Sequence, residues 1–120
     1  MMATAGIIIA ALFYGLIGLA ALLRPRHLLQ GFGIEAEAVD SRNEIRAVYG
    51  GLPLAIAGLL AFTLGGSDLA DGILVALAAV SAGIAVGRLV SAAIDRQMGR
   101  NPMIFTILEL IVAALIAGGI

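Results

Sequence analysis

The chain has 120 residues, which is enough for a single domain over residues 1–120, and 62% of them are apolar before its 16 glycines are counted. Soluble domains reach about 45–50% with glycine included, so a chain of this composition cannot cover its surface with polar groups in water. The net charge of −1 gives no electrostatic reason to bind nucleic acid. The absence of cysteine and the single histidine exclude disulfides, thiolate metal sites and multi-histidine metal sites.

Four apolar runs are long enough to cross a bilayer as helices, because about 20 apolar residues span the hydrocarbon core. The expected helices cover residues 4–23, 42–64, 69–95 and 102–119. The predicted fold class is therefore all-α, an integral membrane four-helix antiparallel bundle. The first run lacks a positively charged flank and is longer than the apolar part of a usual signal peptide, so we expect a retained helix.

Residues at the helix ends support these bounds. Pro25 discourages continuation of the first helix, and residues 28–40 are expected to form a loop on the membrane surface. Ser41 followed three residues later by Glu44 is a capping-box pattern that predicts the start of the second helix.

Two prolines carry further predictions about the helices. Pro53 lies inside the second helix and removes a backbone hydrogen bond near Tyr49, so a kink is predicted there. Asn101 is expected to cap the fourth helix, with Pro102 at its first position, where proline is preferred.

The distribution of arginine predicts the orientation. Arg24, Arg26 and Arg42 lie between the first two helices, and Arg96 and Arg100 lie between the last two. The turn at residues 65–70 and both termini carry no arginine or lysine. By the positive-inside rule both arginine-bearing loops face the cytoplasm, so both termini lie on the outer side. The use of arginine without lysine fits a bacterial genome, and we expect a multi-pass protein of the bacterial inner membrane.

Two charged residues must enter the bilayer if their helices cross it. The apolar run 73–87 is too short to span without Arg88, and the apolar pieces on either side of Glu109 are each too short. A rise of about 1.5 Å per residue puts both side chains roughly 10 Å from the cytoplasmic surface. An isolated charge at such depth costs at least ~2.5–3.5 kcal/mol. We therefore expect Glu109 to pair with Arg88 first, or with Arg46, which can also snorkel to the inner edge.

Other polar side chains are expected to complete this buried polar cluster in the cytoplasmic half. Tyr49 shares the arginine-bearing face of the second helix, and Ser91 and Asp95 share the arginine-bearing face of the third. Asn43 lies about one turn nearer the cytoplasm. The cluster is either a ligand-binding site or a structural clamp between helices, and the sequence leaves both interpretations open.

Small residues recur every four positions on the third helix: Ala79, Gly83, Gly87 and Ser91. The second helix offers Gly51 and Ala55 at the same spacing. Small residues at this spacing let helices approach closely in a membrane. We expect these positions to pack helices within one chain, with packing between two chains as the alternative.

Residues 43–51 read Asn-Glu-Ile-Arg-Ala-Val-Tyr-Gly-Gly. This N-E-x-R-A-x-Y-G-G motif resembles that of a bacterial family of small four-helix inner-membrane proteins, known only as a domain of unknown function and loosely similar to DoxX-like proteins. The resemblance extends to Pro25, to residues 32–34, to Gly87-Arg88 with Ser91 and Asp95, and to Glu109. It implies a four-helix inner-membrane fold and supplies no activity. Some DoxX-like proteins are linked to quinone-coupled redox or to membrane complexes, which is an analogy of fold.

Three classes of function fit these features. The first is a binding protein whose polar cluster holds an amphipathic or anionic ligand, such as a lipid headgroup or a quinone. The second is an accessory subunit of a larger membrane complex. The third is a small oligomeric transporter that uses Glu109 to carry protons or cations, although the apolar outer half argues against access from both sides.

An enzyme is the least expected class, because no nucleophile–base pair, metal cluster or nucleotide-binding loop appears. No catalytic residue and no cofactor can be named from the sequence. The expected partners are the lipid bilayer, a bound lipid or quinone, and a second copy of the chain or a membrane-complex partner.

The orientation can be tested with a reporter that is active only in the cytoplasm. Fused after Ile120, the reporter should be silent, because the arginine asymmetry puts the C-terminus outside. The same reporter inserted in the loop at residues 96–100 should be active. Strong activity of the C-terminal fusion would overturn the predicted orientation.

Overall fold

The structure is a computed structural model that describes all 120 residues, and its regular elements are all helical. In chain order they are α1 (Met2–Leu23), α2 (Pro25–Gln30), α3 (Val39–Ile45), a π-helical segment η1 (Arg46–Gly51), α4 (Leu52–Thr63), α5 (Ala70–Asp95) and α6 (Arg100–Ala117). The segments α3, η1 and α4 form one continuous helix. Together with α1, α5 and α6 it makes four helices that are long and apolar enough to span a membrane.

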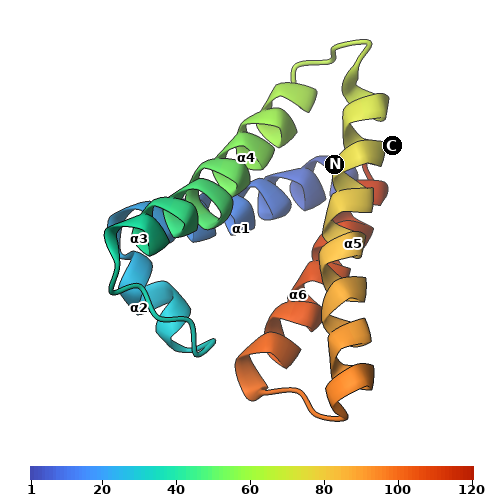
Figure 1. The fold of residues 1–120 in the computed structure, drawn as a ribbon. Coiled ribbons are helices and arrows are strands. Elements are labelled where there is room, and N and C mark those ends of the chain that lie inside the picture. The colour runs from blue at the N-terminus through green and yellow to red at the C-terminus, as the bar shows by residue number, and fades with distance from the viewer.

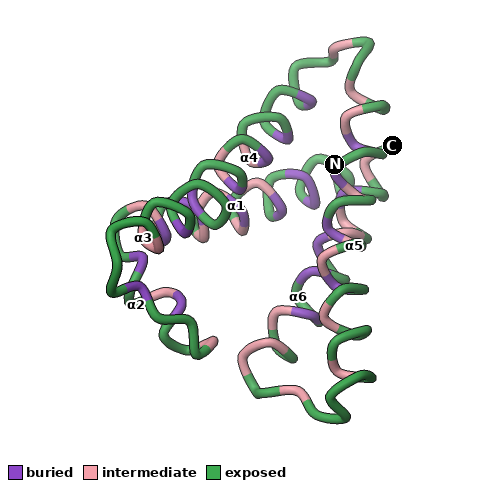
Figure 2. Tube along the Cα trace, viewed as in Figure 1, coloured by how far each residue is buried: buried purple, intermediate pink, exposed green.

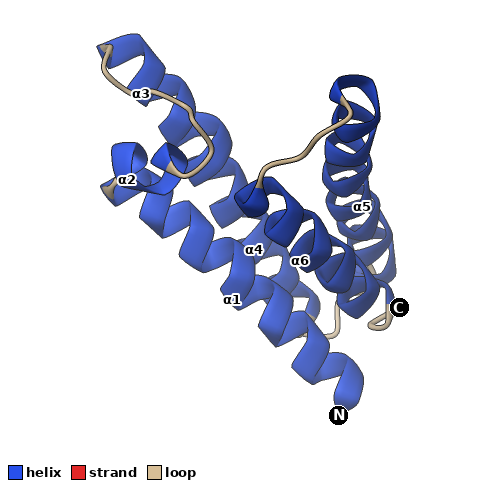
Figure 3. Cartoon of the chain, turned by 90° about the horizontal axis from the view of Figure 1, so that it is seen from below, coloured by secondary structure: helices blue, strands red, loops and turns tan.

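The helices form two hairpins (Figure 1). In the first hairpin α1 packs along α4 and η1, and in the second α5 packs along α6. Contacts between α1 and α6 join the hairpins, so α6 lies between α1 and α5 (Figure 3). Gly6 contacts Leu115 and Gly119 contacts Ile7, so both termini lie at the same end. The hairpins spread apart toward α2 and the α5–α6 connection (Figure 1).

The core lies near the ends of the chain, where the two hairpins meet. It consists of Ile7, Ala10, Tyr14, Ile56, Leu60, Leu74, Leu77, Val112 and Ile116. Most other large apolar residues are exposed, and exposed residues recur along every long helix in Figure 2. Leu16 is 66% exposed, and Phe62 and Ile111 are each more than half exposed. Because soluble monomers rarely expose extended apolar surface, this distribution is compatible with a bundle surrounded by lipid.

The backbone hydrogen-bond pattern of the second long helix changes from α-helical to π-helical just before Pro53. The ring of a proline clashes with the carbonyl four residues earlier in a regular α-helix. Here the preceding turn is π-helical, and the N–H of Leu52 bonds to the carbonyl of Ala47, five residues back. At the position of the predicted kink near Tyr49 the structure therefore has a π turn. Such turns are frequent at functional sites, and this one carries Val48 and Tyr49 into the lining of a cavity described below.

The connection between α1 and α4 differs from the predicted loop. Pro25 begins helix α2 instead of only ending α1, since proline is favoured in the first turn of a helix. The predicted cap at Ser41 is wrong, because α3 already begins at Val39 and its N-cap residue Ala38 has no side-chain cap bond. A small apolar cluster of Leu29, Ala36 and Ile45 packs under this segment and positions α3 instead.

The predicted cap at Asn101 is also wrong. Helix α6 begins at Arg100 after Gly99 and has no side-chain cap bond. The Asn101 side chain donates from Nδ2 to the carbonyl of Gly31 at 2.9 Å, which ties the start of α6 to the end of α2. The Asn101 side chain, which the sequence pattern assigned to capping α6, therefore makes a tertiary contact instead.

The small-residue ridge of α5 faces outward, so the prediction that it packs helices within the chain is wrong. A Cβ atom added at Gly83 or Gly87 would meet nothing within 4 Å, and Ala79 and Ser91 are exposed. Helix α5 instead turns a different face inward, which carries Leu74, Leu77, Ser81 and Ala85. The bulkier residues of that face fill the space between the hairpins.

Helix α1 approaches η1 closely at two glycines, Gly18 and Gly50. A Cβ atom at Gly18 would lie 2.8 Å from the carbonyl oxygen of Gly50 and 2.7 Å from Cγ of Leu54. The predicted packing residue Gly51 is exposed, and its nearest neighbour is a carbonyl of its own helix at 3.9 Å. The neighbouring glycine, Gly50, is therefore the one that lets the helices approach.

The substitution Gly18→Ala should lower thermal stability in detergent, since a backbone carbonyl would have to move. Overpacking of this kind costs about 1–3 kcal/mol. Gly58→Ala is the matched control, because Gly58 is exposed on a helix and has nothing within 4 Å of an added Cβ. The control should leave the melting temperature unchanged or raise it. Equal melting temperatures for the two variants would contradict the close approach.

Candidate functional site

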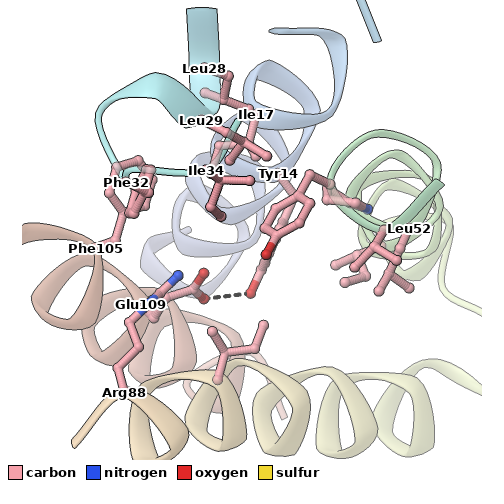
Figure 4. Close-up of a pocket in the computed structure, with 15 residues that line it drawn as sticks. Tyr14, Ile17, Leu28, Leu29, Phe32, Ile34, Leu52, Arg88, Phe105 and Glu109 are labelled. Carbon is pink, nitrogen blue, oxygen red and sulfur yellow. Dashed lines mark hydrogen bonds between the residues drawn. The ribbon is translucent and has the colours of Figure 1, made fainter. Parts of the chain in front are cut away.

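A buried hydrogen-bond network joins three helices. The Tyr14 hydroxyl on α1 donates to Oε2 of Glu109 on α6 at 2.7 Å (Figure 4). The same hydroxyl is hydrogen-bonded to Oγ of Ser81 on α5. Because the phenol has one proton and gives it to the carboxylate, Ser81 is the donor in the second bond. Glu109 is 4% exposed, Tyr14 is 2% exposed and Ser81 is fully buried.

Helical periodicity brings these three polar groups to the centre of the bundle. On α1, Tyr14 follows the buried residues Ile7 and Ala10 at spacings of seven and four. On α6, Glu109 lies on the same face as Val112 and Ile116. Tyr14, Ser81 and Glu109 therefore each occupy one position on the inward-facing side of a helix, and the other positions on that side are mostly apolar. Since buried polar groups need partners, the three side chains satisfy one another.

Arg88 reaches the same region from α5 without forming an ion pair. Its side chain extends toward Glu109 and Phe105 (Figure 4), and its guanidinium carbon lies 5.9 Å from the centroid of the Phe105 ring. Nη1 is buried and has no hydrogen-bond partner. A buried donor without a partner costs about 1–3 kcal/mol, so this N–H group is available to a ligand.

Tyr14, Arg88 and Glu109 line a cavity of about 390 Å³ between the two hairpins. Twelve of its 15 lining residues are hydrophobic, tyrosines included. They come from α1, the α2 region, the π turn and α4, α5 and α6: Tyr14, Ile17, Leu28, Leu29, Phe32, Ile34, Val48, Tyr49, Leu52, Pro53, Ile56, Ile84, Arg88, Phe105 and Glu109. A largely apolar cavity with a few convergent polar groups is the usual form of a small-molecule site.

The segment after α2 covers one end of this cavity. Phe32 packs edge-to-face against Phe105 of α6, with ring centroids 5.2 Å apart. The Asn101–Gly31 hydrogen bond lies beside this contact and holds the same two elements together. The connection between α1 and α3 therefore forms part of the cavity wall and contacts the first turns of α6.

The residues predicted for a polar cluster divide into two groups. The structure brings Tyr49, Arg88 and Glu109 together in the cavity lining. Four others are exposed and lie outside it: Asn43, Arg46, Ser91 and Asp95. The expected ion pair of Glu109 is absent, because its hydrogen-bond partner is the Tyr14 phenol.

Arg46 has a different role from the one predicted. Its Nε donates to the carbonyl of Leu22 at 3.1 Å, and Leu22 belongs to the last turn of α1. The last carbonyls of a helix lack partners within the helix. Arg46 therefore satisfies the end of α1 instead of the carboxylate of Glu109.

Two residues of the network, Tyr14 and Ser81, were not predicted. Both lie in long apolar runs, where a hydroxyl group in a membrane helix needs a partner. That requirement is a usable signal, but it does not identify the partner. The hydrogen bonds depend on how α1, α5 and α6 are rotated against each other.

Comparison with known proteins identifies a family that covers nearly the whole chain. The family model described as "Domain of unknown function (DUF4345)" matches residues 2–118. No curated protein and no solved structure matches the chain.

The change Tyr14→Phe should lower thermal stability, because it leaves Glu109 and Ser81 without their buried partner. Loss of a hydrogen bond to a charged group costs about 1.5–3 kcal/mol. Tyr49→Phe is the control: this second tyrosine is 39% exposed and makes no side-chain hydrogen bond. Melting curves in one detergent should separate the two variants, and coinciding curves would refute the network.

Proposed function

Because the chain belongs to the DUF4345 family, whose function is unknown, we propose a function from the geometry of its cavity. The protein binds an amphipathic membrane molecule that has a neutral, oxygen-bearing head, such as a quinone. The observation that carries this proposal is the buried Nη1 of Arg88, a donor without a hydrogen-bond partner on a residue that lines an apolar cavity.

The charges in the cavity favour a neutral head. One guanidinium, Arg88, and one carboxylate, Glu109, line the same space, so their charges offset each other. A phosphate group there would meet the carboxylate as well as the guanidinium. A carbonyl oxygen needs only a single donor, which Nη1 can supply. The Tyr14 phenol is already committed to Glu109 and Ser81, so it holds the carboxylate in place.

The remaining lining suits the apolar part of such a molecule. Ile17, Leu52 and Ile56 line the cavity from α1 and α4, with the π turn adding Val48. A volume of about 390 Å³ falls in the range of roughly 300–1,000 Å³ of small-molecule pockets. The resemblance to DoxX-like proteins, some of which are linked to quinone-coupled redox, agrees with this ligand class.

The proposal includes a location in the bilayer. Four helices of sufficient length and an apolar outer surface support a multi-pass membrane protein. The membrane that we propose is the bacterial inner membrane, as the use of arginine without lysine suggested. The arginine-bearing connections lie at the end of the bundle toward which the cavity is displaced. The positive-inside rule makes this the cytoplasmic half.

Arg88→Met should weaken quinone binding, because it keeps an unbranched, flexible side chain and removes the hydrogen-bond donor. The protein is purified in mild detergent, ubiquinone-2 is added, and bound ligand is counted by native mass spectrometry. We expect at least a tenfold loss of the bound fraction, since a hydrogen bond to a charged group contributes about 1.5–3 kcal/mol.

Arg46→Met is the matched control, since Arg46 lies outside the cavity. It should bind ubiquinone-2 as the unaltered protein does. Circular dichroism should confirm that both variants keep their helices. Equal binding by all three proteins, or no binding by the unaltered protein, would refute the proposed function.

The outward ridge of α5 favours a second candidate, an accessory subunit of a membrane complex. Gly83 and Gly87 leave open space beside α5, where another transmembrane helix could approach closely. The same native mass spectra test this candidate. Masses of defined complexes that disappear with Gly83→Leu would support it, and a monomer alone would count against it.

A further inference from the structure

A basic recess lies at the end of the first hairpin, outside the cavity. It has a volume of about 480 Å³ and is lined by Leu23, Arg24, Pro25, Arg26, His27, Arg42 and Arg46. Four of the chain's seven arginines are in this lining, and no carboxylate is. The recess is therefore the strongest concentration of positive charge on the protein.

Backbone carbonyls hold three of the arginines in place. Arg42 donates from Nη1 to the carbonyls of Ala36, at 3.0 Å, and Glu37, at 2.7 Å. Arg46 donates through Nε to Leu22. Arg26 donates through Nε to Ala36 at 3.4 Å. These neutral acceptors fix the side chains without removing their positive charge.

Several guanidinium N–H groups remain free for a ligand. Arg46 uses only Nε and Arg42 uses only Nη1 in these bonds, and Arg24 makes no side-chain hydrogen bond. Acidic residues of the same connection, Glu35, Glu37, Asp40 and Glu44, are exposed and absent from the lining. Each arginine therefore presents unused donors together with an uncompensated charge.

We propose that this recess binds a phosphate group. Guanidinium groups match phosphate oxygens with paired, charge-assisted hydrogen bonds, and several arginines in one recess can share its charge. Basic pockets beside transmembrane helices on the cytoplasmic side bind anionic headgroups. The phosphate belongs either to an anionic phospholipid of the surrounding leaflet or to a free anion. This site is separate from the cavity and does not depend on the function proposed for it.

The test compares two double variants with the same loss of charge. Arg24→Gln/Arg46→Gln removes two arginines from the recess, whereas Arg96→Gln/Arg100→Gln removes two from the other arginine-bearing loop. Each purified protein is titrated with phosphatidylglycerol or phosphatidylcholine, and bound lipid is counted by native mass spectrometry. A third arm adds inorganic phosphate to the phosphatidylglycerol titration.

The unaltered protein and the Arg96/Arg100 variant should prefer phosphatidylglycerol to phosphatidylcholine. The recess variant should bind phosphatidylglycerol at least tenfold more weakly, because each basic residue near an anionic surface contributes about fivefold. Displacement by millimolar inorganic phosphate would identify a free anion as the ligand. Resistance to displacement would identify the phospholipid headgroup.

Two results would overturn the proposal. One is the absence of a preference for phosphatidylglycerol together with no binding of inorganic phosphate. The other is an equal loss of binding in both double variants, which would indicate a general effect of charge. If the recess variant does not fold, Arg24→Gln alone replaces it, because the Arg24 side chain makes no hydrogen bond that the fold needs.

Discussion

The hydrogen bond from Tyr14 to Glu109 is the interaction on which the rest of the arrangement depends. A carboxylate inside an apolar bundle must have a partner, and here the partner is a phenol from the other hairpin. Ser81 completes the network from α5. The hydrogen bonds that satisfy this one acidic group thereby link α1, α5 and α6 at the centre of the bundle.

The cavity follows from the way in which the two hairpins meet. They pack closely near the chain termini and separate toward α2 and the start of α6 (Figure 1). In the first hairpin, α1 packs closely against the π turn at Gly18 and Gly50. In the second hairpin, α5 packs along α6. Arg88 and Glu109 lie where this separation begins, so their polar groups face an apolar space that the connection after α2 covers.

Two chemically different sites result at one end of the bundle. In the cavity a single guanidinium is offset by a carboxylate, which suits a neutral polar head with an apolar tail. The recess is lined by four arginines and no carboxylate, and backbone carbonyls hold three of these arginines in place, which suits phosphate. Helix α2 separates the sites: Leu28 and Leu29 line the cavity, whereas Arg26 and His27 line the recess.

The sequence by itself determined the four long apolar helices and required that Arg88 and Glu109 lie within two of them, because the length of an apolar run is a property of the chain alone. It also indicated the irregular turn before Pro53, since a missing N–H is a local defect. The depth of a residue along its helix could not identify the hydrogen-bond partner of Glu109. The reason is that the side chains of Tyr14, Arg46 and Arg88 differ in the direction they face as well as in depth. Only the tertiary structure decided that Tyr14 is the partner of Glu109 and that the Gly83–Gly87 ridge faces outward. The physical reason is that helix rotation and helix crossing are set by all the packed side chains together.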